Sequence, residues 1–330
     1  MTGGLTVEPT TSPRLVELER AFPQNPFLTS RFARALDTLG GHPLLLTAPR
    51  DRQGPCGALG VLWTGRLRRV FEVFSIPATD ADDPFWIGLR EFARSRRVSD
   101  LRLYSFGTPG GVLPKMPGEI SRRGRVEFVV DLNVGNLDAA MADAMPRVRK
   151  AQRAGLQLRR STDPAAAAEL EGLFVSSMTR RASRGEHVPS AGEPARFAPY
   201  LTAGAGEIFF AARDAEIVSG ALILRAAKGG YNLHGGTSDS GRQCGASHFL
   251  MHAICWTLRN EGCSQFNLGG AGAAEQGLGT FKAMFATHKV DLAEAEIDVA
   301  PAAIRFAMSV FERVRATLTR HRPGPGMAGP

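Results

Sequence analysis

A series of alternating strands and helices is predicted twice along the chain, and this repetition limits the folds that it can adopt. In the first half, apolar alternation and helical spacing predict a series of strands and helices. The helices are expected at 25–41, 84–97 and 136–155, and the strands at 42–50, 56–65, 68–77, 98–107 and 124–132. Gly40 and Gly41 are suited to end the first helix, and Pro84 to begin the second.

The second half repeats this alternation with a more specific order. A helix over 163–183 precedes a three-stranded antiparallel meander over 206–238. A helix at 245–262, a strand at 263–270, a short helix at 279–287 and a strand at 289–297 follow. A meander that leads into a helix, a strand and a second helix is the order expected of GCN5-related N-acetyltransferase (GNAT) folds. There, two strands splay apart and the N–H groups of a helix N-terminus face the gap.

The predicted fold class is therefore α+β, with twin GNAT-like domains, each a mixed sheet flanked by helices. A chain of 330 residues is long enough for two cores of ordinary size. We expect an N-terminal domain over 1–150 and a C-terminal domain carrying the transferase motifs over 151–300. A last helix over 301–322 would pack back on the first domain, and the Gly/Pro-rich tail 323–330 would be disordered.

Composition and charge narrow the class of protein. The cysteines at 56, 244, 255 and 263 lack C-x-x-C spacing and a histidine cluster, which argues against a metal site and favours free thiols in a reducing cytosol. No window approaches the roughly 20 apolar residues of a membrane helix. We expect a cytoplasmic protein without a membrane span. Its net charge of +8 favours anionic partners, and peripheral membrane contact stays open.

Four segments together resemble the FemAB branch of the GNAT superfamily. "NPFLTSRFARAL" is similar to its opening helix, and "FVVDLNVGNLDAAMADAMPRVRKAQRAGLQLR" to its mid-chain signature. "GYNLHGGTSDS" resembles the strand and loop before the central helix, and "EGCSQFNLGGAGAAEQGLGTFKAMFATH" the Asp-x-Gly-Gly strand end and Phe-Lys helix. Two positions depart from that pattern: Asn267 stands where many members have aspartate, and Phe285-Ala286 where Phe-Gly is usual.

Lys282 is the first catalytic candidate. Only five lysines occur beside 35 arginines, so a lysine between Phe281 and Phe285 is informative. In a helix capped by Thr280, its charge would stabilise the oxyanion of an acyl transfer or hold a phosphate. The structural alternative is a surface lysine whose stem covers apolar neighbours. Phe281 would line the same site, beside Asn267, Gly269 and Gly270.

The strand before the central helix supplies the second set of candidates. His234 could take a proton from an attacking amine, or it could be an ordinary structural histidine. Substrate-binding candidates around it are Tyr231, Asn232, Gly235 and Gly236. The stretch 241–249 loosely fits a pyrophosphate loop, which makes Gly245 and Ser247 binding candidates; an ordinary serine-capped helix start is the alternative.

A basic helix supplies the remaining candidates. Arg149 and Arg153 share one face of the predicted helix, and Arg147 and Lys150 another. These four side chains would suit a pyrophosphate-bearing acceptor or a tRNA acceptor stem, although a solvated helix face has the same pattern.

The resemblance implies an N-acyltransferase that moves an aminoacyl group from aminoacyl-tRNA to an amine of a peptidoglycan precursor or small metabolite. No cofactor is implied beyond this co-substrate. A second hypothesis keeps the fold and makes acyl-CoA the donor, in polysaccharide, lipid or natural-product biosynthesis. A third is a non-catalytic binding protein with a degenerate transferase fold, which Asn267 and the lack of an obvious base would allow.

Overall fold

The computed structural model describes most of the chain. The described residues are 4–48, 56–66, 68–77, 79, 83–106, 113–186, 188, 197–272 and 275–300. The expected last helix at 301–322 and the tail at 323–330 lie outside the described residues.

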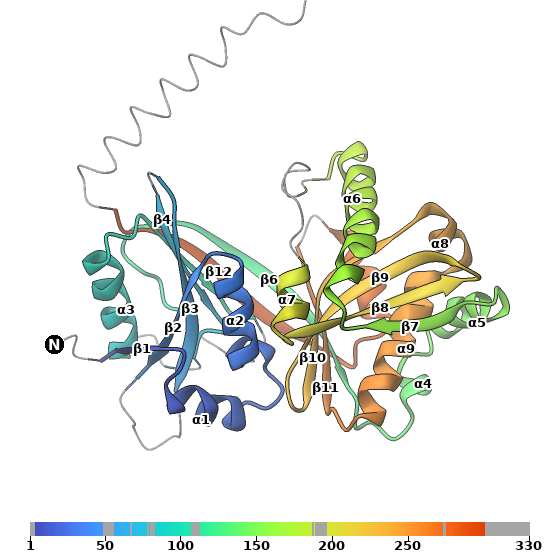
Figure 1. The fold of residues 1–330 in the computed structure, drawn as a ribbon, viewed down its shortest axis with the longest axis horizontal. Coiled ribbons are helices and arrows are strands. Elements are labelled where there is room, and N and C mark those ends of the chain that lie inside the picture. Colours follow the sequence, from blue (N-terminus) through green and yellow to red (C-terminus); the bar gives the residue numbers. More distant parts are fainter. Residues whose placement is uncertain are drawn as a thin grey trace, which may run out of the picture.

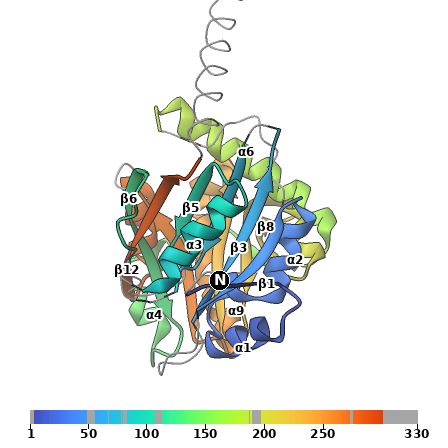
Figure 2. The same ribbon diagram turned by 90° about the vertical axis from the view of Figure 1, so that its left-hand side faces the viewer.

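The first half contains six strands and short helices. The strands are β1 (Thr6–Pro9), β2 (His42–Thr47), β3 (Gly57–Thr64), β4 (Arg69–Phe74), β5 (Asp100–Tyr104) and β6 (Glu119–Asp131). The helices are α1 (Pro13–Ala21), η1 (Pro26–Leu28), α2 (Ser30–Thr38), α3 (Pro84–Ser95), α4 (Leu137–Ala140) and α5 (Met145–Arg153). Figures 1 and 2 show α3 on one side of strands β2 to β5 and α2 on the other.

The second half contains the predicted meander and its following helices. Its strands are β7 (Gln157–Ser161), β8 (Gly206–Arg213), β9 (Glu216–Arg225), β10 (Gly229–Thr237), β11 (Gln265–Ala271) and β12 (His288–Asp298). Its helices are η2 (Pro164–Ala166), α6 (Ala167–Ser183), α7 (Ala198–Thr202), α8 (Asp239–Cys244), α9 (Ala246–Asn260) and α10 (Gln276–Ala283).

The α+β class is confirmed, and within the described residues the strands of both halves join in one mixed sheet. Its order is β1-β2-β3-β4-β5-β12-β6-β11-β10-β9-β8-β7. Strand β12, from the second half of the chain, inserts between β5 and β6 and pairs antiparallel with both. The long strands β6 and β12 thus run between the two halves (Figure 1). Backbone hydrogen bonds between strands therefore join the two halves, and this junction is called the seam below.

Side chains at helix starts explain several element boundaries. Ser12, Thr29 and Asp83 each accept a hydrogen bond from a first-turn N–H of α1, α2 or α3, as N-caps do. Gly40 follows α2 with a φ of 89°, a left-handed conformation that glycine adopts without strain. The predicted glycine end of this helix is confirmed.

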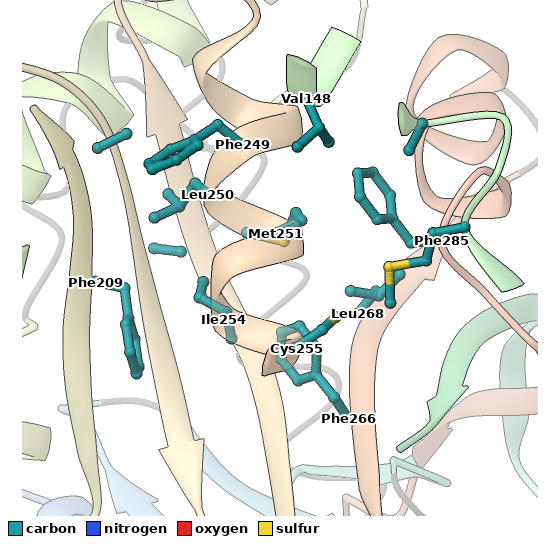
Figure 3. Close-up of a cluster of buried hydrophobic side chains, with 14 of the residues drawn as sticks. Val148, Phe209, Phe249, Leu250, Met251, Ile254, Cys255, Phe266, Leu268 and Phe285 are labelled. Atoms are coloured by element: carbon teal, nitrogen blue, oxygen red, sulfur yellow. The ribbon is translucent and has the colours of Figure 1, made fainter. Parts of the chain in front are cut away.

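The largest apolar cluster surrounds α9. Phe249, Leu250 and Ile254 of this helix pack between Phe209 of β8 and Phe266 of β11 (Figure 3). The exposed surface of all five side chains is 9% or less. The opposite face of the meander is covered by α6 and α7 through a smaller cluster. Helix α9 is therefore a buried central helix, which fits its largely apolar sequence.

A third cluster joins the two halves. Phe27 of η1 packs against Phe32 of α2 and against Tyr231 of β10, with ring centroids 5.2 and 4.8 Å apart. Leu224 of β9 belongs to the same cluster. This contact buries the aromatic rings of the first half directly beside strand β10, next to the site described below.

Three local predictions are wrong. The helix expected over 136–155 is two helices, α4 and α5, because Pro146 in the first turn of α5 lacks the N–H that would continue the helix. The stretch 241–249, which loosely fits a pyrophosphate loop, is helical on both sides of Gly245: 241–244 end helix α8, which Ser238 caps, and 246–249 begin α9. Helix α10 begins at Gln276, so Thr280 lies inside it and its hydroxyl donates to the Gln276 carbonyl.

Candidate functional site

The candidate site lies where two parallel strands diverge. Strands β10 and β11 pair only over Gly229–Tyr231 and Gln265–Asn267. Beyond this point the register of β10 shifts between Asn232 and His234, and that of β11 against β6 between Asn267 and Gly270. Both strands lie at the centre of the molecule in Figure 1. Backbone groups that leave a ladder in this way can face a ligand.

Lys282 extends from α10 to this point of divergence. Only 8% of the residue's surface is exposed, and Nζ donates a hydrogen bond of 2.8 Å to the Gly270 carbonyl. A side chain at Gly269 would bring its Cβ within 3.4 Å of Nζ, 3.1 Å of the Asn232 carbonyl oxygen and 3.6 Å of the Tyr231 hydroxyl. Gly269 has a φ of 75°, so glycine suits both the backbone and the space. Lys282 is therefore a buried cation among backbone oxygens.

Burial lowers the pKa of Lys282 from 10.5 to about 8, and the nearby Arg125 guanidinium acts in the same direction. The Glu127 and Glu275 carboxylates partly offset this shift. An ammonium group with a pKa close to neutral can both stabilise negative charge and exchange its proton during a reaction.

Glu127 of β6 organises the polar groups around the lysine. It is 1% exposed, and its two oxygens accept hydrogen bonds of 2.7 Å from the Tyr231 hydroxyl and from Nδ2 of Asn267. Its neighbour Arg125 lies 4.0 Å away and pairs with Glu294 of β12 at 2.6 Å. Buried carboxylates are stable only when they are paired and hydrogen-bonded in this way. The network connects β6, β10, β11 and β12 at the seam.

The geometry explains why asparagine can stand at position 267. Its Nδ2 donates to Glu127, while its Oδ1 accepts a hydrogen bond of 2.8 Å from the Gly269 N–H. An aspartate has no N–H to donate, so an ionised aspartate there would face the Glu127 carboxylate with like charge. The Asn267 amide thus has a hydrogen-bond partner for both its nitrogen and its oxygen, and it stabilises the left-handed conformation at Gly269.

Two buried polar atoms beside the site have no hydrogen-bond partner among the described residues. They are Oδ1 of Asn232 and Nε of Arg125. Gly270 allows the approach of Arg125, since a Cβ on Gly270 would lie 2.3 Å from that Nε. An acceptor and a donor that are desolvated without partners mark positions where a substrate can form hydrogen bonds.

His234 lies in an apolar setting on β10. Its ring contacts Phe174 of α6 and Phe197, with ring centroids 5.3 and 5.2 Å apart. Burial lowers its pKa from 6.5 to about 4, so the ring is neutral at pH 7. A neutral imidazole can accept a proton, but a conjugate acid with this pKa makes it a weak base.

His234 should make the protein less stable in mild acid. Between pH 6.5 and pH 4 the unfolded chain binds a proton at this position that the folded protein does not. The free energy of unfolding should therefore fall as the pH is lowered, by at most roughly 1.4 kcal/mol per pH unit from this group. In urea unfolding, the free energy of unfolding of a His234→Phe variant should fall less steeply with decreasing pH than that of the wild type. The exposed His42→Phe variant is the control, and equal slopes in all three proteins would contradict the prediction.

The predicted basic residues occupy the outer face of α5. Arg147, Arg149, Lys150 and Arg153 are exposed, and none forms an ion pair with another described residue. Val148 and Ala151 on the other face are buried against α9. Nη1 of Arg147 lies 3.6 Å from Sδ of Met284, two residues beyond Lys282. The basic face therefore begins next to α10.

The other predicted binding residues have structural contacts. Ser247 shares a hydrogen bond of 2.8 Å with Thr237, whose hydroxyl lies 2.8 Å from that of Ser219. Gly245 has a φ of 81° and joins α8 to α9. A Cβ on Gly236 would lie 2.4 Å from the backbone of Leu173, so this glycine allows α6 to approach β10.

Gly235 and Phe281, two further predicted binding residues, also have structural contacts. A Cβ on Gly235 would lie 3.2 Å from the Gly220 carbonyl oxygen. The Phe281 ring packs against Phe285 and His248, with centroids 5.5 and 4.9 Å apart. Phe281 thus fixes the helix turn that carries Lys282 against α9.

Sequence reasoning missed Glu127 and the ion pairs that approach the site. Glu127 could have been noticed as the one acid inside the apolar run "VEFVV". Arg181 of α6 forms ion pairs with Glu186 and with Glu275, just before α10. No local pattern indicates this second contact, because its partners are far apart in the sequence.

Among the described residues, no three His, Cys, Asp or Glu side chains are grouped so that they could hold a metal ion. No helix in the part of the chain that the structure describes is long and apolar enough to cross a membrane.

Comparison with known proteins supports the fold. Residues 139–282 match the family model described as "Acetyltransferase (GNAT) domain". FemX is 12% identical, with a TM-score of 0.62 over 88% of this chain and 96% of FemX. L-PGS from Bacillus licheniformis is 14% identical, with a TM-score of 0.54 over 92% of this chain and 96% of that one. No curated protein matches the sequence.

A third solved structure extends the comparison. A tandem GNAT protein from the clavulanic acid biosynthesis pathway is 11% identical, with a TM-score of 0.53 over 90% of this chain and 99% of that one. The matched domain model and the divergence of β10 from β11 agree with the GNAT fold expected from the sequence. The fold of the described residues is FemAB-like, as the sequence resemblance implied.

Proposed function

We propose that the protein is a FemAB-like aminoacyltransferase, which moves an aminoacyl group from aminoacyl-tRNA to an amine and forms a peptide bond. The acceptor would be a peptidoglycan precursor or an amine-bearing metabolite. The observation that carries the proposal is the buried Lys282 ammonium at the divergence of β10 and β11, beside the Glu127 network.

The chemistry requires a positive charge and a proton donor. The amine nitrogen attacks the ester carbonyl, and the new C–N bond forms as a negative charge develops on the carbonyl oxygen. The C–O bond to the ribose then breaks, and the leaving hydroxyl takes up a proton while the nitrogen loses one. Lys282 would stabilise the oxyanion, because a charge held in a desolvated site acts more strongly than in water.

The exposed basic residues of α5 support an RNA donor. These are Arg147, Arg149, Lys150 and Arg153, which form no ion pairs with described residues. The basic face that they form begins beside Met284. Exposed positively charged side chains favour contact with a phosphate backbone. These residues would hold the acceptor stem while its end approaches Lys282.

An acyl-CoA donor is the second candidate. It is favoured by the match of 139–282 to an acetyltransferase domain and by the similar fold of the tandem GNAT protein from the clavulanic acid biosynthesis pathway, a structure solved without AcCoA. Either donor would present its carbonyl carbon to the same site, beside Lys282 and the Glu127 network.

A direct assay separates the donors. The purified protein is incubated with a small-molecule cell extract and either a charged tRNA pool or a mixture of acyl-CoA esters, and products are found by mass spectrometry. We expect amine products that carry one added aminoacyl residue and that disappear after RNase treatment. RNase-resistant products that need acyl-CoA would favour the second candidate. No product from either donor would contradict both.

The pH dependence of turnover should follow the protonation state of Lys282. Its ammonium is present below a pKa of about 8 and is lost above it. If the charged form stabilises the oxyanion, turnover should fall as the pH rises through about 8. A Lys282→Arg variant keeps its charge, so the residual activity of this variant should not fall in that range. A descending limb that is identical in both proteins would assign it to another group.

A further inference from the structure

A pocket away from Lys282 has an unusual arrangement of charges. It lies where α2 of the first half approaches β7, β8 and β9 of the second. Small residues leave it open: Gly204, Gly206, Ala226 and Ala227, with Thr162 at one side. The charged residues that line it are Arg31, Arg160, Arg225 and Glu207.

Two arginines and one glutamate of the pocket form a closed ring of ion pairs with Glu261, which lies just outside its lining. Arg160 donates to Glu207 through Nε and to Glu261 through Nη1. Arg225 donates to the other oxygens of the same two carboxylates, at 2.8 and 2.7 Å. Glu207 is 2% exposed. Each carboxylate is thus neutralised and each guanidinium is held in one orientation, with Nη2 of Arg160 still without a hydrogen bond to another described residue.

Arg31 adds one charge that the ring does not balance. It is half-buried on α2, with Cδ 3.8 Å from the position a Cβ would take on Gly204. It forms no ion pair with another described residue. The three guanidinium groups therefore outnumber the two carboxylates by one. A half-buried charge without a counter-charge is unfavourable unless a ligand or solvent compensates it.

We propose that this pocket binds an oxyanion that carries a single negative charge, such as a phosphodiester or a carboxylate. Arg31 would supply the opposite charge, and the preorganised Arg160 and the Thr162 hydroxyl would supply further donors. The ligand's single negative charge would bring the net charge of the three guanidinium groups, the two carboxylates and the ligand to zero. Orientation of Arg160 by Glu207 and Glu261 removes part of the entropy cost of binding. The inference does not depend on the transfer chemistry at Lys282.

The test is a titration that needs no enzymatic substrate. The full-length protein, labelled with ¹⁵N-arginine, is titrated with dimethyl phosphate and separately with acetate while the Nε–Hε signals are followed by NMR. We expect saturable shifts of the Arg31 signal, which is assigned by its absence in Arg31→Gln. That variant should bind at least about tenfold more weakly, since it loses a charge-assisted hydrogen bond. The Arg20→Gln variant, which removes an exposed arginine of α1, should bind like the wild type.

The two ligands distinguish the sources of the oxyanion. Tighter binding of dimethyl phosphate would indicate a phosphodiester, and tighter binding of acetate a carboxylate-bearing ligand; both support the pocket. Arg31→Gln should melt no lower than the wild type without ligand, because it loses an unpaired charge. Linear shifts with both ligands, or equal affinity in Arg31→Gln and wild type, would overturn the inference.

Discussion

Replacing Lys282 with methionine should reduce acyl transfer by about a hundredfold to a thousandfold, the loss typical of removing one oxyanion donor. Methionine fills a similar volume but cannot carry a charge or donate to the Gly270 carbonyl. Turnover of the product identified by mass spectrometry, measured with donor in excess, gives the loss in the chemical step.

The same variant should remain folded, which separates a catalytic from a structural role. Burial lowers the pKa of Lys282, so the folded protein holds this charge at a cost. Removing it should leave the free energy of unfolding unchanged or raise it by about 1–2 kcal/mol. A matched Lys115→Met variant removes an exposed lysine and should keep full activity. A Lys282→Met protein as active as the wild type would refute the proposed role.

Replacing Glu127 with leucine should lower the free energy of unfolding by about 3–5 kcal/mol, the range for breaking a buried charged network. The variant would leave the Tyr231 hydroxyl and Nδ2 of Asn267 without their acceptor. It would also remove one of the two carboxylates near Arg125 and near Lys282, leaving Glu294 and Glu275 respectively. Urea unfolding followed by circular dichroism measures the change.

Two further variants locate the source of that effect. Glu91→Leu makes the same substitution at an exposed position of α3 and should change stability by less than about 0.5 kcal/mol. Glu127→Gln keeps the size and an acceptor oxygen, so its cost should fall between the two. Similar stabilities for Glu127→Leu and Glu91→Leu would mean that the network contributes little to folding.

Local patterns predicted most elements correctly because their signals lie within a few residues. The meander is confirmed as β8, β9 and β10, and the apolar segment 245–262 as the buried helix α9. The errors occurred where a single residue overrides periodicity. Pro146 divides one predicted helix into two, and Ser238 begins a helix where a loop was expected. Neither effect changes the hydrophobic pattern on which the prediction relied.

The candidate site was predicted only in part. Lys282, Asn267 and Tyr231 were selected from the sequence, and the structure brings them together around Gly269. Glu127, which connects Tyr231 and Asn267, was not selected, because it lies 104 residues before the one and 140 before the other. Its partners become neighbours only when β6 pairs beside β11.

The α+β class, the order of strands and helices in the second half, and the choice of Lys282 as a catalytic candidate could all be predicted from the amino-acid sequence. These follow from periodicity, turn residues and a rare residue type, which are local properties. The tertiary structure decided that β12 crosses between the halves, that Lys282 is buried at a strand divergence, and that Arg31 approaches an ion-pair ring on β7, β8 and β9. Burial and charge pairing arise between distant segments, so only the folded chain defines them.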